Sequence, residues 1–151
     1  QTLCIQFLID EHDIQTNLKW RDMMVGSDGI PNLKGKPHPR LYGTFPRILS
    51  RYVRDQNILS LSEAVRRMTS LTAATFGLSD RGQIKEGWFA DLTLFDPERV
   101  HDEATYDAPQ RLASGIHTVV VGGKVAFQLG QHRNAGSGSM LRYRRDAYTP
   151  Q

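Results

Sequence analysis

Cysteine is scarce and long apolar runs are absent in this sequence of 151 residues, whose single thiol is Cys4. One thiol excludes an intramolecular disulfide and a cysteine-rich zinc site, so we expect Cys4 to be a small core residue. No stretch approaches the roughly 20 apolar residues that cross a bilayer. The first residues also lack the charged segment and cleavage pattern of a secretory signal. These features predict a cytoplasmic location and no membrane partner.

Patterns typical of metal and nucleic-acid binding are also missing. A hydrolytic zinc site needs about three protein ligands, yet four of the histidines share no ligand spacing: His12, His101, His117 and His132. The net charge of +3 comes from arginines spread along the chain, and no interleaving of aromatic and basic residues indicates a nucleic-acid partner. The one dense basic patch, residues 142–145, is expected to be a solvated tail.

The first half of the chain predicts one short strand and several helices. Asp10 is a candidate N-cap for a helix that places Ile14 and Leu18 on one face. The apolar run 23–25 ends at glycine and turn residues and predicts a buried strand. Residues 30–39 hold three prolines and predict a loop.

Further helices are expected after this loop. We predict that Thr44 caps a second helix, whose apolar stripe is Phe45, Ile48, Leu49, Tyr52 and Val53. Ser60 and Glu63 form a capping box for a third helix. A short helical turn from Thr72 is followed by Gly77, which suits the C′ position.

The pattern changes to short alternating segments after Gly77. Leu92 and Leu94 indicate a half-buried strand, and residues 116–121 form a strong β run. The glycines at 122 and 123 predict a tight turn into a hairpin partner at 124–127. Residues 1–78 therefore resemble the end of an α/β unit, and residues 79–151 resemble part of a β-sandwich that has too few strands to close alone.

Two short motifs could carry chemistry. Asp28, in Gly-Ser-Asp-Gly, follows the predicted strand, where α/β folds build active sites; an aspartate that bonds its own turn backbone is the alternative. In Pro-His-Pro-Arg, two prolines stiffen the chain around His38 and Arg40. A rigid arginine can bind a carboxylate through two hydrogen bonds, and a structural salt bridge is the alternative.

Several stretches in order resemble the N-acyl-D-amino-acid deacylases (D-aminoacylases) of the amidohydrolase superfamily. The widely shared part is Asp-Arg-Gly-Gln-Ile-Lys-Glu-Gly-Trp-Phe-Ala-Asp-Leu, at 80–92. The stretches at 24–31 and 63–69 and Leu-Phe-Asp-Pro at 94–97 also match. The narrower part is Pro-His-Pro-Arg-Leu-Tyr-Gly-Thr-Phe-Pro-Arg, at 37–47, which is typical of the deacylases.

The resemblance implies a fold and a site. Residues 1–78 would be the last strand and helices of a (β/α)₈ barrel, and residues 79–151 the C-terminal part of a small composite β-sandwich. The family's zinc ligands lie on earlier barrel strands and are absent here. Asp28 would be the catalytic acid–base, in possible contact with zinc, Arg40 would bind the substrate α-carboxylate, and His38 would line the same pocket.

The resemblance also implies the partners and leaves two alternatives. The partners would be a small N-acyl-D-amino acid and the N-terminal barrel portion of the same enzyme. A cyclic-amide hydrolase of the hydantoinase or dihydropyrimidinase type shares the 81–96 segment. A non-catalytic module is the other alternative, because the isolated chain is expected to bind no stoichiometric zinc and to be inactive.

Overall fold

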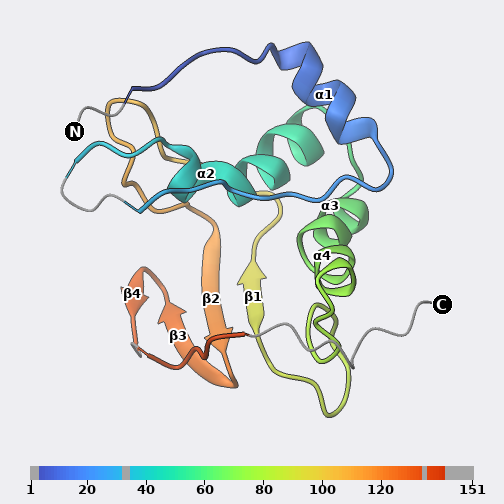
Figure 1. The fold of residues 1–151 in the computed structure, drawn as a ribbon. Coiled ribbons are helices and arrows are strands. Elements are labelled where there is room, and N and C mark those ends of the chain that lie inside the picture. The colour runs from blue at the N-terminus through green and yellow to red at the C-terminus, as the bar shows by residue number, and fades with distance from the viewer. Residues whose placement is uncertain (1–3, 32–34, 134–135, 142–151) are drawn as a thin grey trace.

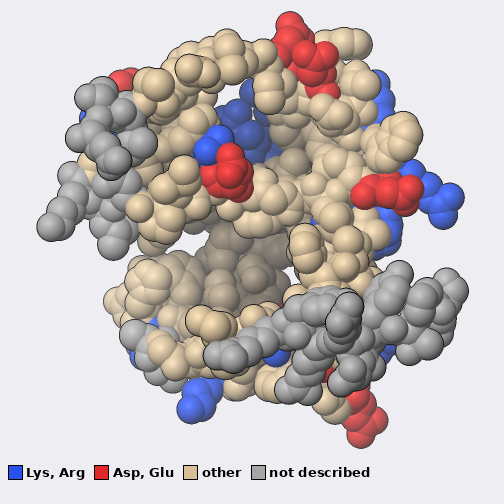
Figure 2. Space-filling model, in the orientation of Figure 1, with Lys and Arg blue, Asp and Glu red and all other residues tan. Residues whose placement is uncertain are grey.

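The computed structural model describes residues 4–31, 35–133 and 136–141. Helices occupy the first half of the chain and a small sheet the second half (Figure 1). The space-filling view shows a hollow between the helical part and the sheet (Figure 2). The expected basic tail at 142–145 lies outside the described residues.

Helix α1 (Glu11–Lys19) begins where its cap was predicted. The Asp10 carboxylate accepts a hydrogen bond of 2.6 Å from the His12 backbone N–H, which satisfies one of the unpaired donors of the first turn. Leu18 is the buried residue of this helix and belongs to the main apolar core. The predicted apolar face is therefore confirmed at Leu18, with Ile14 packed against the same core.

Helix α2 (Arg40–Arg47) starts four residues earlier than the Thr44 cap that we predicted. Pro39 precedes the first helical residue, and its fixed φ suits a helix start. Thr44 lies inside the helix, where its hydroxyl donates to the Arg40 carbonyl at 2.8 Å. The prediction of a Thr44 cap was wrong because that hydroxyl bonds back to the preceding turn, as threonine does within helices.

The chain widens directly after α2 into a π-helix, η1 (Ile48–Asp55). Pro46 has no backbone N–H to donate, and the Ser50 hydroxyl donates to the Pro46 carbonyl at 3.0 Å. The expected single stripe is thus split between two helices. Its central members Ile48, Leu49 and Tyr52 are buried, whereas Phe45 is exposed.

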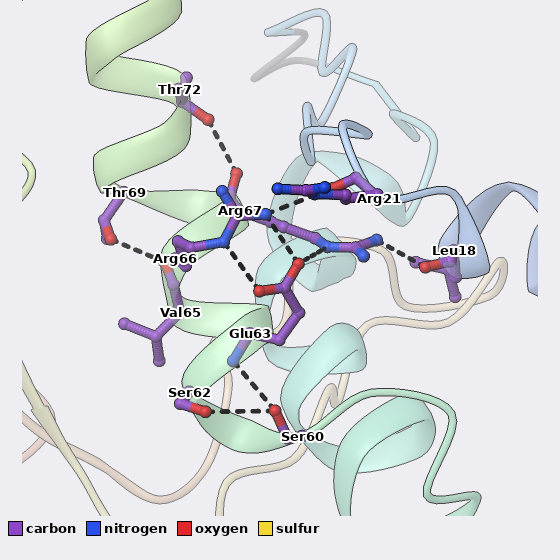
Figure 3. Close-up of polar contacts among 10 residues, drawn as sticks. All are labelled: Leu18, Arg21, Ser60, Ser62, Glu63, Val65, Arg66, Arg67, Thr69 and Thr72. Atoms are coloured by element: carbon purple, nitrogen blue, oxygen red, sulfur yellow. Dashed lines mark hydrogen bonds and ion pairs between the residues drawn. The ribbon is translucent and has the colours of Figure 1, made fainter.

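Helices α3 (Leu61–Met68) and α4 (Ser70–Thr75) follow a confirmed N-cap at Ser60, whose hydroxyl accepts from the Glu63 N–H at 3.2 Å. The Glu63 carboxylate does not complete a capping box. It binds Arg66 and Arg67, both at 2.7 Å (Figure 3). Arg67 is buried and also donates to the Leu18 carbonyl at the end of α1. Gly77, with a φ of +68°, follows α4 as predicted.

The second half forms a four-stranded antiparallel sheet of strands β1 (Leu92–Phe95), β2 (Ile116–Val121), β3 (Lys124–Gln128) and β4 (Gln131–His132). Its order is β1-β2-β3-β4. Gly122 and Gly123 have φ angles of +56° and +78°, which is the requirement of a two-residue hairpin turn. The predicted positions of these strands and of the turn are confirmed, but Leu92 and Leu94 are exposed, so the prediction of a half-buried first strand was wrong.

Residues 23–25 do not form the predicted strand. They have no regular secondary structure and are partly buried, and the Val25 N–H donates to the Arg67 carbonyl at 3.5 Å. A strand requires a neighbouring strand for its ladder, and the four strands of the described chain pair only with one another. The structure therefore has a small antiparallel sheet with helices, and the barrel strand stays a prediction.

The core lies among the helices and the turn after β1. It is built from Leu18, Ile48, Leu49, Tyr52, Leu59, Ala64 and Val100. Cys4 is exposed, so its predicted place in the core was wrong. Among the described residues, no helix is long and apolar enough to traverse a bilayer.

Candidate functional site

Asp28 has a backbone conformation that few residues other than glycine adopt. Its φ is +47°, in the left-handed region that aspartate and asparagine tolerate better than most residues. The turn is closed by Ser27, whose hydroxyl accepts from the Gly29 N–H at 3.2 Å. The Asp28 side chain is 83% exposed, so the carboxylate projects outward from the turn.

The structure brings Asp28 and Arg40 together. Nη2 of Arg40 lies 2.9 Å from Oδ2 of Asp28. Nε of the same guanidinium is buried and has no hydrogen-bond partner among the described residues. Arg40 therefore binds one carboxylate through Nη2, while its buried Nε donates to no atom of the described residues.

His38 lies beside Arg40 and is fixed by it. Nδ1 of His38 accepts a hydrogen bond of 3.0 Å from the Arg40 backbone N–H, which leaves the proton of a neutral ring on Nε2. Burial and the positive charges of Arg40 and Arg47 lower the pKa of His38. The ring also contacts Tyr106 edge to face, with 5.4 Å between the ring centroids.

A cavity of about 300 Å³ lies between α2 and residues 102–106. Both predicted pocket residues, His38 and Arg40, line it, together with Gly43, Thr44, Arg47, Asp102 and Tyr106. Asp28 is outside this lining and touches it through Arg40. The structure thus places Asp28, Arg40 and His38 in one neighbourhood.

An ion pair between Arg47 and Asp102 closes one side of the cavity. Nε of Arg47 donates to Oδ2 of Asp102 at 2.6 Å. Burial alone would lower the pKa of Arg47, but the hydrogen bond and negative charge of Asp102 raise it. Neither residue was predicted from the sequence to belong to the site. Arg47 was present in the motif at 37–47, whereas Asp102 stands in an irregular segment without a pattern of its own.

A metal ion has no complete ligand set in the described chain. No group of three or more histidine, cysteine, aspartate or glutamate side chains is close enough to hold one among the described residues. Asp28 is the one carboxylate in the candidate site that faces outward. The residues present therefore do not fit a metal on their own.

Comparison with known proteins identifies the family. The model of the amidohydrolase family matches residues 19–127. This chain belongs to the amidohydrolase family. It is 50% identical over 132 residues to the D-aminoacylase of Alcaligenes xylosoxydans xylosoxydans, a match that covers 85% of this chain and 27% of the relative.

Solved structures of amidohydrolases share the fold of this chain. A crystal structure of D-aminoacylase is 46% identical with a TM-score of 0.84, and the match covers 87% of this chain and 28% of that one. The N-acyl-D-glutamate deacylase of Bordetella bronchiseptica, complexed with zinc and a phosphonate inhibitor, is 43% identical with a TM-score of 0.77. That match covers 82% of this chain and 26% of the other. The resemblance to the deacylases is confirmed.

The chain spans about a quarter of the length of the relatives that it matches. Dihydroorotases are weaker matches: the dihydroorotase of Endomicrobium trichonymphae is 32% identical over 85 residues, which is 50% of this chain. Within the amidohydrolase family, the sequence is therefore more similar to the deacylases.

Proposed function

We propose that this chain is the C-terminal part of a zinc-dependent amidohydrolase that hydrolyses N-acyl-D-amino acids to a D-amino acid and a carboxylate. Its identity of 43–50% to D-aminoacylase and N-acyl-D-glutamate deacylase supports this substrate class. The observation that carries the proposal is the contact of 2.9 Å between Asp28 and Arg40. It brings a proton-accepting group and a carboxylate-binding group within reach of one small substrate.

Arg40 is proposed to bind the substrate α-carboxylate. Its guanidinium already binds one carboxylate through Nη2, and a planar guanidinium can bind a carboxylate with two hydrogen bonds. A substrate carboxylate at this position would either displace Asp28 or bind beside it. His38 lines the same cavity and holds the Arg40 backbone in place.

Asp28 is proposed to move the proton. A carboxylate beside the scissile amide takes a proton from the attacking water and then gives it to the departing amine, so that the carboxylate is regenerated after each turnover. The exposed, outward-facing carboxylate and the constrained backbone at φ +47° support this role. Strained conformations of this kind are found at functional sites more often than elsewhere.

Zinc is proposed for the complete protein, where bound water would become a nucleophile at neutral pH. Its other ligands would come from residues outside this chain, since the described residues hold no ligand cluster. Residues 1–78 are proposed to complete a (β/α)₈ barrel and residues 79–151 a small β-sandwich. Both parts are proposed to pack against the remaining N-terminal portion of the same protein. The complete protein is proposed to be cytoplasmic.

Replacing Asp28 by asparagine tests the proposed chemistry. In the complete enzyme, Asp28→Asn should lower kcat for an N-acetyl-D-amino acid by about a thousandfold, because the amide cannot accept the proton. Zinc content by elemental analysis should stay similar. Asp55→Asn, on the exposed end of η1, is the control and should keep normal turnover. Turnover retained in Asp28→Asn would contradict the role of Asp28.

A substrate comparison tests the reaction class. The wild-type complete enzyme should hydrolyse N-acetyl-D-amino acids and discriminate against their L-enantiomers, which present the scissile amide on the other side of the bound carboxylate. Hydantoins and dihydropyrimidines form the second arm of the assay. Faster turnover of those cyclic amides would replace the deacylase proposal by the cyclic-amide alternative.

A further inference from the structure

Asp102 has a nearly buried carboxylate whose two oxygens are both used. Its side chain is 7% exposed. Oδ2 accepts from Nε of Arg47 at 2.6 Å, and Oδ1 accepts from the Ala104 N–H at 3.1 Å. A carboxylate removed from water needs such partners, and these two fix its position between residues 102–106 and α2.

The same carboxylate reaches the helix face that carries Arg40. Positions 40, 43 and 47 of α2 are separated by three and four residues, so they share one face. A Cβ atom built at Gly43 would lie 2.7 Å from Oδ1 of Asp102, which is too short for any real contact. Glycine at 43 thus allows Asp102 to lie directly against the helix.

Both ends of α2 contact the segment 102–106. At the end of the helix, Arg47 binds Asp102. Just before its start, the His38 ring packs edge to face on Tyr106, and His38 Nδ1 accepts from the Arg40 N–H. The segment therefore sets how α2 lies and, through it, where the Arg40 guanidinium is held.

We propose that Asp102 is a positioning residue for substrate binding, acting through Arg47 and Gly43 to hold the α2 face that presents Arg40. The proposal rests on the proposed function of Arg40. It assigns to Asp102, 62 positions away in the chain (102 − 40), the task of keeping the carboxylate-binding guanidinium in place. The Asp102 carboxylate binds Arg47 and the Ala104 N–H rather than Arg40, so its proposed effect on Arg40 is transmitted through α2 and concerns substrate binding rather than proton transfer.

Asp102→Asn in the complete enzyme tests the proposal, since asparagine keeps the shape and removes the charge that binds Arg47. KM for an N-acetyl-D-amino acid should rise about tenfold while kcat stays within about twofold. Loss of folded enzyme alone would lower the apparent kcat and leave KM unchanged. That second pattern would overturn the proposal.

Coupling to Arg40 separates positioning from a general structural role. In an Arg40→Met background, Asp102→Asn should cause no further rise in KM, because the guanidinium it positions is gone. The carboxamide analogue of the substrate, which lacks the α-carboxylate, should show equal KM values in wild type and Asp102→Asn. Additive effects, or an equal rise for the carboxamide, would contradict the proposal.

Gly43→Ala is the second variant, chosen in case Asp102→Asn folds poorly. Alanine favours a helix more than glycine does, yet its Cβ must displace the Asp102 carboxylate. KM should rise as in Asp102→Asn, in protein whose cooperative thermal unfolding shows that it is folded. Arg99→Gln removes an exposed ion pair with Asp96 and is the matched control, with an unchanged KM.

An unchanged KM in Gly43→Ala would overturn the proposal, whereas a wild-type enzyme without deacylase activity would overturn the proposed function instead.

Discussion

Gly115 occupies a position that only glycine can fill. Its φ is +73°, and a Cβ atom there would lie 2.4 Å from the Val100 nitrogen and 2.5 Å from the Arg99 carbonyl carbon. These neighbours are backbone atoms, which cannot rotate away as a side chain can. Gly115 also accepts the Asp96 N–H through its carbonyl at 2.9 Å, so the turn after β1 and the start of β2 depend on this close approach.

Gly115→Ala should destabilise the protein by about 3 kcal/mol, because the overlap adds to the cost of a positive φ. Gly87→Ala is the matched control: Gly87 has a φ of +78° with no atom within 4 Å of the added Cβ. It should cost about 1 kcal/mol from the φ alone. Urea unfolding of both variants measures the difference, and equal losses of stability would show that the backbone contact is unimportant.

At the scale of elements, two arginines bound by the Glu63 carboxylate join α3 to the end of α1. The hydrogen bond from Arg66, followed in size by the one from Arg67, lowers the pKa of Glu63 to about 2. Arg66 also donates to the Arg21 carbonyl, and Arg67 donates to the Leu18 carbonyl (Figure 3). One carboxylate therefore orients two arginines that together bind the chain leaving α1.

The pKa of Glu63 predicts an acid-sensitive contact between these helices. Since the folded pKa is depressed, the stabilisation is complete above the ordinary value of 4.5 and is lost as pH falls toward about 2. Glu63→Gln should be less stable than wild type at pH 7, and the difference should shrink across this window. Denaturant unfolding at several pH values tests it, with the exposed Glu86→Gln as control. A difference independent of pH would contradict the assignment.

The elements that the sequence predicted correctly depend on near neighbours. The Asp10 and Ser60 caps need a donor two or three residues away, and the Gly122-Gly123 turn needs only its own φ angles. The strand expected at 23–25 failed because a strand also needs a neighbouring strand. The Thr44 cap was predicted wrongly because a threonine hydroxyl can either cap a helix or donate to a carbonyl within the helix. The position of Pro39, just before the first helical residue, decides between the two roles.

In the candidate site, too, the sequence predicted the residues that stand in local motifs and not the distant one. Asp28, Arg40 and His38 stand in two motifs close together in the chain, and the structure brings all three into contact or near contact. Asp102 is 55 residues from Arg47, and its importance comes from burial and from the space left by Gly43. Neither property has a local signal in the sequence, so the Asp102 contact required the fold.

On the scale of the whole molecule, the described chain exposes many large apolar side chains. Phe7 is 77% exposed, Leu8 79% and Ile84 90%, and much of the face in Figure 2 carries neither acidic nor basic residues. Large apolar side chains exposed in such number are typical of a surface that another part of a protein covers. Because the relatives are about three times as long as this chain, we expect the proposed N-terminal portion of the complete protein to cover these side chains.

The 151 residues produced alone should therefore bind the apolar dye ANS more strongly, per chain, than the complete protein does. Fluorescence titration of both proteins at equal concentration measures this, and the complete protein serves as the control. Light scattering of the same samples would report association through the apolar surface. Weak dye binding by a monomeric 151-residue chain would show that the surface needs no cover.

The π-helix η1 makes the length of one segment a constraint on the evolution of this protein. A π-helix closes its hydrogen bonds over five residues rather than four, so it accommodates one residue more than an α-helix between the same ends. Deleting a single residue from 48–55 would allow an ordinary α-helix. The flanking chain would keep its direction relative to α2, so Arg47 could still bind Asp102 while Leu59 stayed in the core. A further residue inserted into 48–55 would instead turn the flanking chain by about 100° relative to α2, so related sequences should tolerate a deletion in η1 more often than an insertion.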